Sequence, residues 1–406
     1  MKQERKVSGV AEQTIKWQEG DATHALRWRS LAGVAAPKRV VVADDRMTAD
    51  AAYRLACEGT ALLWRGDFQN ARQLLQALAR RVVKKPRKAA KASQPATPLE
   101  RFHQYRLAQS QRARTLGMLL LPFEAGHRIP LRRAPDVSQA CVEAYGAAYG
   151  ADDQPQPYAA SLRELLGIVG AYEWRKAGVE IAALGAPGVR IHAHYGVFSP
   201  VRGEYLDLVA SAPLPAALAT TPLAFDIGTG TGVLAALLAR RGVGRVVATD
   251  QDPRALACAR ENVARLGLAA QVEVVEADLF PPEAAGRAAL AVCNPPWLPG
   301  RPASPLEHAI YDPDSRMLLG FLRGLAARLA PGGEGWLILS DLAEHLGLRT
   351  RAELLAAIDA AGLRVVARHD IRPRHPRAAD AADPLHEARA AELTSLWRLA
   401  VTGQAD

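Results

Sequence analysis

The sequence predicts an α/β protein: a doubly wound, seven-stranded sheet in the C-terminal half, preceded by a mostly helical N-terminal region. Short apolar runs alternate with segments of helical periodicity from residue 223 onward. Acidic residues end three successive runs. Charge also separates the two halves, because residues 1–220 carry 31 Lys and Arg against 20 Asp and Glu, a net charge of +11, whereas residues 221–406 carry 20 against 22. We therefore expect a cofactor domain behind a basic accessory region.

The first strand leads into a glycine-rich turn. Leu223 to Ile227 is apolar, and Gly228, Thr229, Gly230 and Gly232 follow it before a helical segment. The glycines alone leave open a nicotinamide dinucleotide, S-adenosylmethionine, or a tight turn without a ligand. Asp226 favours S-adenosylmethionine, because a carboxylate at this position repels a pyrophosphate and can receive the cationic amino-acid end of that cofactor.

The next two predicted strands also carry acids at their ends. Asp250 ends the run that starts at Arg245, at the spacing where the second strand of a βαβ unit places an acid on a ribose diol. Asp278 lies near the end of a run from Val272 to Phe280 and can accept from an adenine amino group, with Leu279 against the ring. Each acid alone fits a helix cap or a solvated loop equally well. Three of them at successive strand ends favour a ligand site.

The fourth run, Ala288 to Val292, is soon followed by Asn294, Pro295, Pro296 and Trp297. A planar amide or aromatic amine has a delocalised lone pair, so methyl transfer to it depends on orientation. The Asn294 side-chain carbonyl and the Pro295 backbone carbonyl can each accept one N–H of such a substrate. Trp297 offers a face for stacking, and Asn294 should also border the cofactor. The alternative is an ordinary turn with Trp297 in the core.

Together these motifs resemble the class I S-adenosylmethionine-dependent methyltransferases, in particular the branch that methylates amino nitrogens and carries Asn-Pro-Pro-aromatic. That branch includes small-domain ribosomal RNA enzymes and glutamine-N5 enzymes. The resemblance covers roughly residues 190–402. It implies a Rossmann-like methyltransferase sheet whose last two strands, 363–371 and 393–402, are antiparallel. By the same analogy Tyr195, Phe198 and Arg202 line the substrate pocket.

We expect four regions along the chain. They are an N-terminal helical region (1–83), a basic flexible linker (84–99), an accessory region for substrate recognition (100–188) and the catalytic domain (189–406). The first region predicts a helical hairpin, Ala51 to Glu58 and Phe68 to Val83, in which Asp67 caps the second helix. The basic linker could hold phosphates or act only as a solubilising tether.

Several functions and sites are excluded or disfavoured. No apolar run reaches the roughly 18 residues of a membrane span, and the first residues lack a secretory signal. The four cysteines form no C-x-x-C pair, so we expect a cytoplasmic protein without a zinc site or disulfide framework. His192 and His194 share one strand face but have no third ligand, so we expect no metal. Cys293 has no evident activating base, and we expect it in the core.

The sequence favours an N-methyltransferase acting on a nucleic-acid base, above all in RNA, because the N-terminal half is basic. The alternative is a protein-glutamine N5-methyltransferase acting on a release factor or a ribosomal protein. Asp250 and the segment Arg260-Glu-Asn262 are similar to that subgroup, although it normally has Tyr at the position of Trp297. A second alternative is a non-catalytic nucleic-acid-binding protein on the same fold, and a dehydrogenase is the most distant. Oligomeric state is not predicted.

Overall fold

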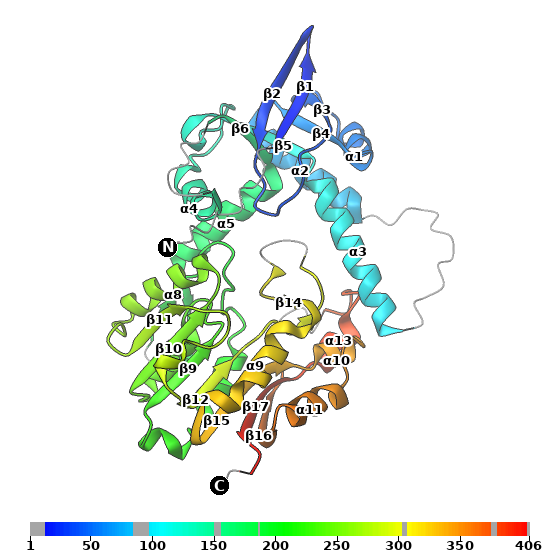
Figure 1. Ribbon diagram of the computed structural model, residues 1–406. Coiled ribbons are helices and arrows are strands. Elements are labelled where there is room, and N and C mark those ends of the chain that lie inside the picture. The colour runs from blue at the N-terminus through cyan, green and yellow to red at the C-terminus, as the bar shows by residue number, and fades with distance from the viewer. Residues whose placement is uncertain are drawn as a thin grey trace, which may run out of the picture. The chain divides into compact units, whose positions relative to one another are not determined.

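The computed structural model describes residues 13–83, 97–149, 156–185, 187–302, 307–374 and 380–403 (Figure 1). The chain divides into two compact units. The first comprises Met1–Ser93 and Arg106–Tyr172, and the second comprises Gln94–Tyr105 and Glu173–Asp406. Two of the boundaries between them fall inside long helices, α3 (Pro98–Leu116) and α5 (Leu162–Ala177).

The N-terminal unit is built on a six-stranded mixed sheet of order β1-β2-β6-β5-β4-β3. Neighbours β3, β4 and β5 run parallel, whereas β1–β2 and β5–β6 are antiparallel pairs. Its strands are β1 (Thr14–Glu19), β2 (Ala22–Trp28), β3 (Arg39–Ala43), β4 (Thr60–Trp64), β5 (Leu119–Phe123) and β6 (Tyr158–Ser161). Its further helices are α1 (Ala49–Cys57), α2 (Phe68–Val83) and α4 (Ser138–Tyr149).

The helices of this unit are expected, but its six-stranded sheet is not. The helices are present, but β4 separates α1 from α2, so the predicted helical hairpin is wrong. The strands β4 and β5 are buried at every residue. A strand covered on both faces shows no alternation of polar and apolar residues, so periodicity cannot distinguish it from a buried helical turn. The cap of α2 is confirmed, since Asp67 Oδ1 accepts from the Gln69 backbone N–H at 2.8 Å.

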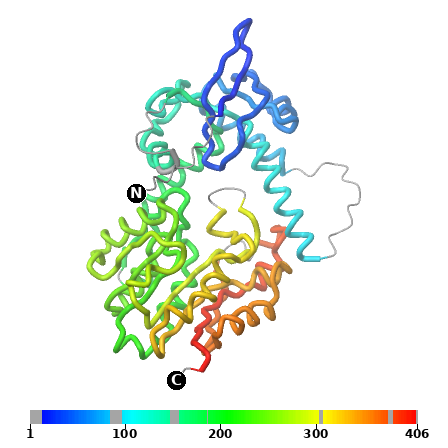
Figure 2. Tube along the Cα trace, in the orientation of Figure 1, coloured from blue at the N-terminus to red at the C-terminus, as the bar shows by residue number. Residues whose placement is uncertain are grey.

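The C-terminal unit contains a seven-stranded sheet of order β11-β10-β9-β12-β15-β17-β16, whose trace is followed in Figure 2. The first five strands run parallel, and β17 is antiparallel to both of its neighbours. The strands are β9 (Leu223–Ile227), β10 (Arg245–Asp250), β11 (Val272–Glu276), β12 (Ala288–Cys293), β15 (Leu329–Ser340), β16 (Leu363–Ile371) and β17 (Thr394–Val401). The doubly wound fold and its final antiparallel pair are therefore confirmed.

Helices cover both faces of this sheet. They are α6 (Glu204–Ser211), α7 (Val233–Arg240), α8 (Pro253–Arg265), α9 (Arg316–Arg328) and α11 (Arg351–Ala360). Two short helices, α10 (Leu342–His345) and α13 (His386–Ala391), pack together in a separate apolar cluster. The unit also contains two short strand pairs, β7 (Val179–Glu180) with β8 (Arg190–Ile191) and β13 (Leu298–Pro299) with β14 (Tyr311–Asp312).

Successive strand residues alternate between two apolar cores. In β9, Ala224 packs with α6, α7 and α8, whereas Phe225 and Ile227 pack with α9 and α11. The same alternation holds in β12 and β15, and all of these side chains are buried. Side chains alternate along a strand, so a sheet with apolar residues in every register must be covered on both sides. We call these the α7-side core and the α9-side core.

Residue types that favour helix starts stand at two helices of the C-terminal unit. Pro253 begins α8, and the capping box of Thr350 and Glu353 begins α11. The predicted strand Val272–Phe280 is shorter, because β11 ends at Glu276. The predicted linker lies largely outside the described residues, which resume at Thr97 one residue before α3. No helix in the described ranges combines the length and apolarity needed to cross a bilayer.

Candidate active site

The glycine turn lies between β9 and α7 in the middle of the seven-stranded sheet. Gly228, Gly230 and Gly232 all have positive φ, at 73°, 55° and 80°. A Cβ on Gly228 would approach Met317 Cε to 2.2 Å, whereas a Cβ on Gly230 would meet no atom within 4 Å. Packing against Met317 thus requires a glycine at position 228, whereas Gly230 faces open space that a ligand can fill.

Asp226 is the buried acid behind this turn. It is the penultimate residue of β9 and is 0% exposed. Its Oδ2 accepts from the Thr229 hydroxyl at 2.6 Å and from the Ala235 backbone N–H at 3.0 Å. Its Oδ1 is buried with no hydrogen-bond partner among the described residues. Burial, and then the charge of Asp250, raise the pKa of Asp226 to about 6. Thr229 therefore supports the acid by hydrogen bonding.

Asp250 ends the neighbouring strand β10, as predicted. Its Oδ2 accepts from the Gly230 backbone N–H at 3.1 Å, and its Oδ1 accepts from the Asp252 backbone N–H at 3.0 Å. Burial raises the pKa of Asp250 despite these bonds. The carboxylate is held rigidly beside the glycine turn, and each oxygen retains a lone pair that can accept a hydroxyl of a ribose diol.

The third predicted acid, Asp278, lies two residues beyond the end of β11. It is exposed and forms an ion pair with Arg316 at 2.6 Å. Next to it, Leu279 has φ 71°, accepts at its carbonyl from the Thr249 hydroxyl at 2.5 Å and packs against the α9-side core. The hydrogen bond from Thr249 holds this segment against the sheet. The contact of Asp278 with adenine stays a prediction from the sequence.

Asn294 follows β12 at the level of the glycine turn. Cys293 pairs with Ile227 in the parallel ladder, so Asn294 and Gly228 are the next residues of two adjacent strands. Trp297 donates its indole N–H to Asn294 Oδ1 at 2.9 Å, and its ring packs against both cores. Pro295 is buried and Pro296 is half-buried. The structure thus brings Asp226, Asp250 and Asn294 together at the carboxyl-terminal ends of three neighbouring parallel strands.

Two residues that the sequence did not indicate support these strand ends. Asp312 accepts from the backbone N–H groups of Met317 and Leu318 at 2.9–3.1 Å and so holds the first turn of α9. Ser315, the residue before α9, makes no capping hydrogen bond with its side chain. This arrangement places Met317 against Gly228. The contact joins segments far apart in the chain, so no local pattern reveals it.

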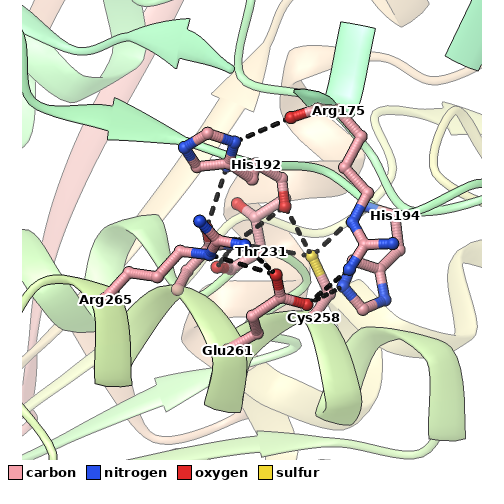
Figure 3. A network of polar contacts seen from close by, with 8 residues as sticks. Arg175, His192, His194, Thr231, Cys258, Glu261 and Arg265 are labelled. Carbon is pink, nitrogen blue, oxygen red and sulfur yellow. Dashed lines mark hydrogen bonds and ion pairs between the residues drawn. The ribbon is translucent and has the colours of Figure 1, made fainter. Parts of the chain in front are cut away.

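His192 and His194 do not lie on one strand face as expected, since both follow the end of β8 without regular structure. They belong to a polar network with α8 (Figure 3). Glu261 accepts from His194 at 2.7 Å and forms ion pairs with Arg175 and Arg265, both at 2.6 Å. Burial opposes ionisation of Glu261, but the hydrogen bonds from Arg265, His194 and Arg175 outweigh it and lower its pKa to about 2. Among the described residues no group of three or more His, Cys, Asp or Glu is arranged to hold a metal ion.

Asn262 connects the same network to the glycine turn. Its Oδ1 accepts from the His192 backbone N–H at 2.9 Å, and its Nδ2 donates to the carbonyls of His192 and Thr231 at 3.1 and 3.0 Å. Cys258 also contacts the His192 carbonyl, at 3.4 Å. The segment around His192 is therefore fastened beside the glycine turn by the buried amide of Asn262.

The three residues expected to line a substrate pocket differ in exposure. Phe198 is 40% exposed, whereas Tyr195 and Arg202 are half-buried. Burial raises the pKa of Glu392, and the hydrogen bond from Ser340 at the end of β15 and the charge of Arg202 oppose this rise. Cys293 is fully buried, and burial raises the pKa of its thiol well above the usual range, as expected for a core residue.

Residues 188–347 match the family model of the methyltransferase small domain. A ribosomal protein L11 methyltransferase from Pelotomaculum thermopropionicum is 39% identical over 147 residues, which cover 36% of this chain and 39% of that protein. A release factor glutamine methyltransferase from Cereibacter sphaeroides is 35% identical over 152 residues, covering 34% of this chain and 51% of the relative. The release factor glutamine methyltransferase of Moorella thermoacetica is 40% identical over 119 residues, covering 27% and 42%. The chain thus spans about half or less of the length of these curated relatives.

Proposed function

We propose that the C-terminal unit, whose residues 188–347 form a methyltransferase small domain of the S-adenosylmethionine-dependent class, methylates a planar amide or amino nitrogen. One observation carries this proposal: among the described residues one oxygen of the buried Asp226 has no partner, Gly230 in the same turn faces open space, and Asn294 follows the adjacent strand at the same level. A cation donor and a planar acceptor amine are the ligands that these groups fit.

The chain's own residues bind and orient both reactants. When bound, S-adenosylmethionine would supply a methyl group on a sulfonium: the S–CH3 bond breaks and leaves a neutral thioether, the N–CH3 bond forms, and the acceptor nitrogen releases one proton to water. Asp226 receives the ammonium of the cofactor's amino-acid end, and Asp250 accepts from its ribose. In this proposal Asp278 accepts from the adenine amino group beside Leu279. Asn294 Oδ1 and the Pro295 carbonyl accept the two N–H bonds of the acceptor, which aims the nitrogen lone pair at the methyl carbon.

The preferred acceptor is a side-chain amide of a translation-related protein. The named activities of the relatives support this choice, since they concern ribosomal protein L11 and release factor glutamine. Trp297 supports it as well, because its ring packs against both cores and its N–H is already bonded, so it is poorly placed to stack a base. A second candidate is an RNA base, which the net charge of +11 over residues 1–220 favours.

A label-transfer experiment separates the two acceptors. The full chain is incubated with S-adenosylmethionine labelled in the methyl group, first with release factors and ribosomal proteins and then with deproteinised RNA. We expect label in protein, and none with the Asn294→Ala variant. Label only in RNA would replace the preferred acceptor with the second. Binding of the cofactor without transfer to either fraction would contradict catalysis and favour a non-catalytic nucleic-acid-binding protein.

A further inference from the structure

Trp297 and Asn294 form a hydrogen bond whose direction is fixed by chemistry. The indole Nε1 lies 2.9 Å from Asn294 Oδ1. An indole N–H only donates, whereas a carboxamide has one accepting end and one donating end. If the carboxamide were rotated by half a turn, its NH2 group would oppose the indole N–H and both donors would lose a partner. The pair is therefore compatible with one orientation of the Asn294 side chain.

The indole itself has little freedom to follow the amide. Its ring packs against the α7-side core and the α9-side core. The preceding Pro296 restricts the backbone. The following Leu298 is 7% exposed and packs with Phe102 and Leu346 in a separate apolar cluster. The position of Nε1 is thus set by the packing of the ring against two cores and by the held backbone on either side, and Nε1 acts as a fixed donor toward Asn294.

We infer that Trp297 is a positioning residue, whose indole N–H selects the orientation of Asn294 that turns a carbonyl lone pair toward the acceptor nitrogen. This inference rests on the proposed function. Carbonyl Oδ1 has two lone pairs, so one bonds the indole and the other accepts the N–H of the substrate. Without the indole N–H, the carboxamide also populates the opposite orientation, which presents its NH2 group to the acceptor amine. That orientation pairs donor with donor and is unproductive.

The matched variants are Trp297→Phe and Trp336→Phe. Each keeps an aromatic ring and removes one indole N–H. Trp336 is 0% exposed and donates to Glu334 Oε2 at 3.0 Å on β15, outside the proposed catalytic groups. We expect Trp297→Phe to lower kcat by about 5- to 10-fold, the worth of one hydrogen bond, with KM and cofactor affinity nearly unchanged. Trp336→Phe should leave kcat unchanged, although it lowers stability.

A spectroscopic readout tests the orientation without turnover. In full-length protein labelled with ¹⁵N-asparagine, the side-chain NH2 signals of Asn294 are identified by their loss in Asn294→Ala. We expect one sharp pair of signals in the native chain and in Trp336→Phe, and broadened or doubled signals in Trp297→Phe. Unchanged Asn294 signals, or an unchanged kcat, in Trp297→Phe would overturn the inference. Absence of methyl transfer by the native chain would instead refute the proposed function. The NMR spectra would still test the orientation of the Asn294 side chain, because they require no turnover.

Discussion

The Thr229 hydroxyl donates a 2.6 Å hydrogen bond to Asp226 Oδ2, yet Asp226 Oδ1 is buried without a partner among the described residues. A buried polar atom without a partner is rare, because the lost solvation is not replaced. The turn thus supplies a hydrogen bond to one oxygen of this carboxylate, Oδ2. We propose that a cationic group of the cofactor occupies the other oxygen, which would connect the buried acid to cofactor binding.

The affinity for S-adenosylmethionine should increase as the pH rises through about 6. Burial raises the pKa of Asp226 to about 6, and the cofactor ammonium binds its ionised form. Binding therefore releases a proton below that pH, which calorimetry in buffers of different ionisation enthalpy measures. In Asp226→Asn the affinity should be lower and this pH dependence absent. A pH-independent affinity in the native chain would refute the proposed ammonium contact.

The same carboxylate should make the ligand-free protein less stable as the pH rises from about 4 to about 6. Its folded pKa lies above the ordinary value of 3.8, so in this window the native state binds more protons than the unfolded state. Denaturant unfolding at several pH values measures this fall. The Asp226→Asn variant should lack this component and be more stable than the native chain above pH 6, and an equal fall in both proteins would contradict the prediction.

Gly230→Ala should weaken cofactor binding more than it weakens the fold. Its φ of 55° strains any side chain, at a cost of about 1 to 2 kcal/mol in the free energy of unfolding. Gly267 is a matched control, since it has φ 70°, follows α8 away from the turn, and a Cβ added to it would meet no atom within 4 Å. We expect both variants to lose similar stability, but only Gly230→Ala to raise the cofactor Kd, by about 10-fold or more. Equal Kd values would show that the open space is not the cofactor site.

Glu261→Gln should destabilise the protein at neutral pH and not at strongly acidic pH. The folded pKa of Glu261, about 2, lies below the ordinary value of 4.5, so its ionised form stabilises the fold above pH 4.5 and that contribution disappears as the pH falls toward 2. We expect a loss of about 1 to 2 kcal/mol at pH 7, allowing for solvent screening of a side chain that is 27% exposed. Unfolding titrations at both pH values check this. A loss that persists at pH 2 would point to packing instead.

Much of the C-terminal unit follows from local sequence. Glycine in the left-handed region, Pro253 at the start of α8 and the capping box at Thr350 are short-range signals, and the structure contains each of them. Asp250 likewise marks its strand end. These features depend on backbone conformations that only a few residue types favour, so a single sequence is enough to find them.

What the sequence missed depends on contacts between distant segments. Five-residue buried strands such as β4 have no period, so the N-terminal sheet could not be distinguished from helices. Met317 against Gly228 and Asp312 at α9 depend on how the chain returns after Trp297. The hydrogen bond from Trp297 to Asn294 was also not predicted. A tryptophan can stack through its ring face or donate through its indole N–H, and its presence in the sequence does not distinguish the two.

The central claim, methyl transfer to a nitrogen oriented by Asn294, is tested most directly by identifying the methylated atom. Methyl-labelled S-adenosylmethionine is incubated with the native chain and with Asn294→Ala, and the labelled acceptor is hydrolysed and analysed by mass spectrometry. We predict label on a planar nitrogen, formed roughly 100-fold more slowly by the variant while its cofactor affinity is unchanged. Label on oxygen or carbon, or full activity in Asn294→Ala, would contradict the account.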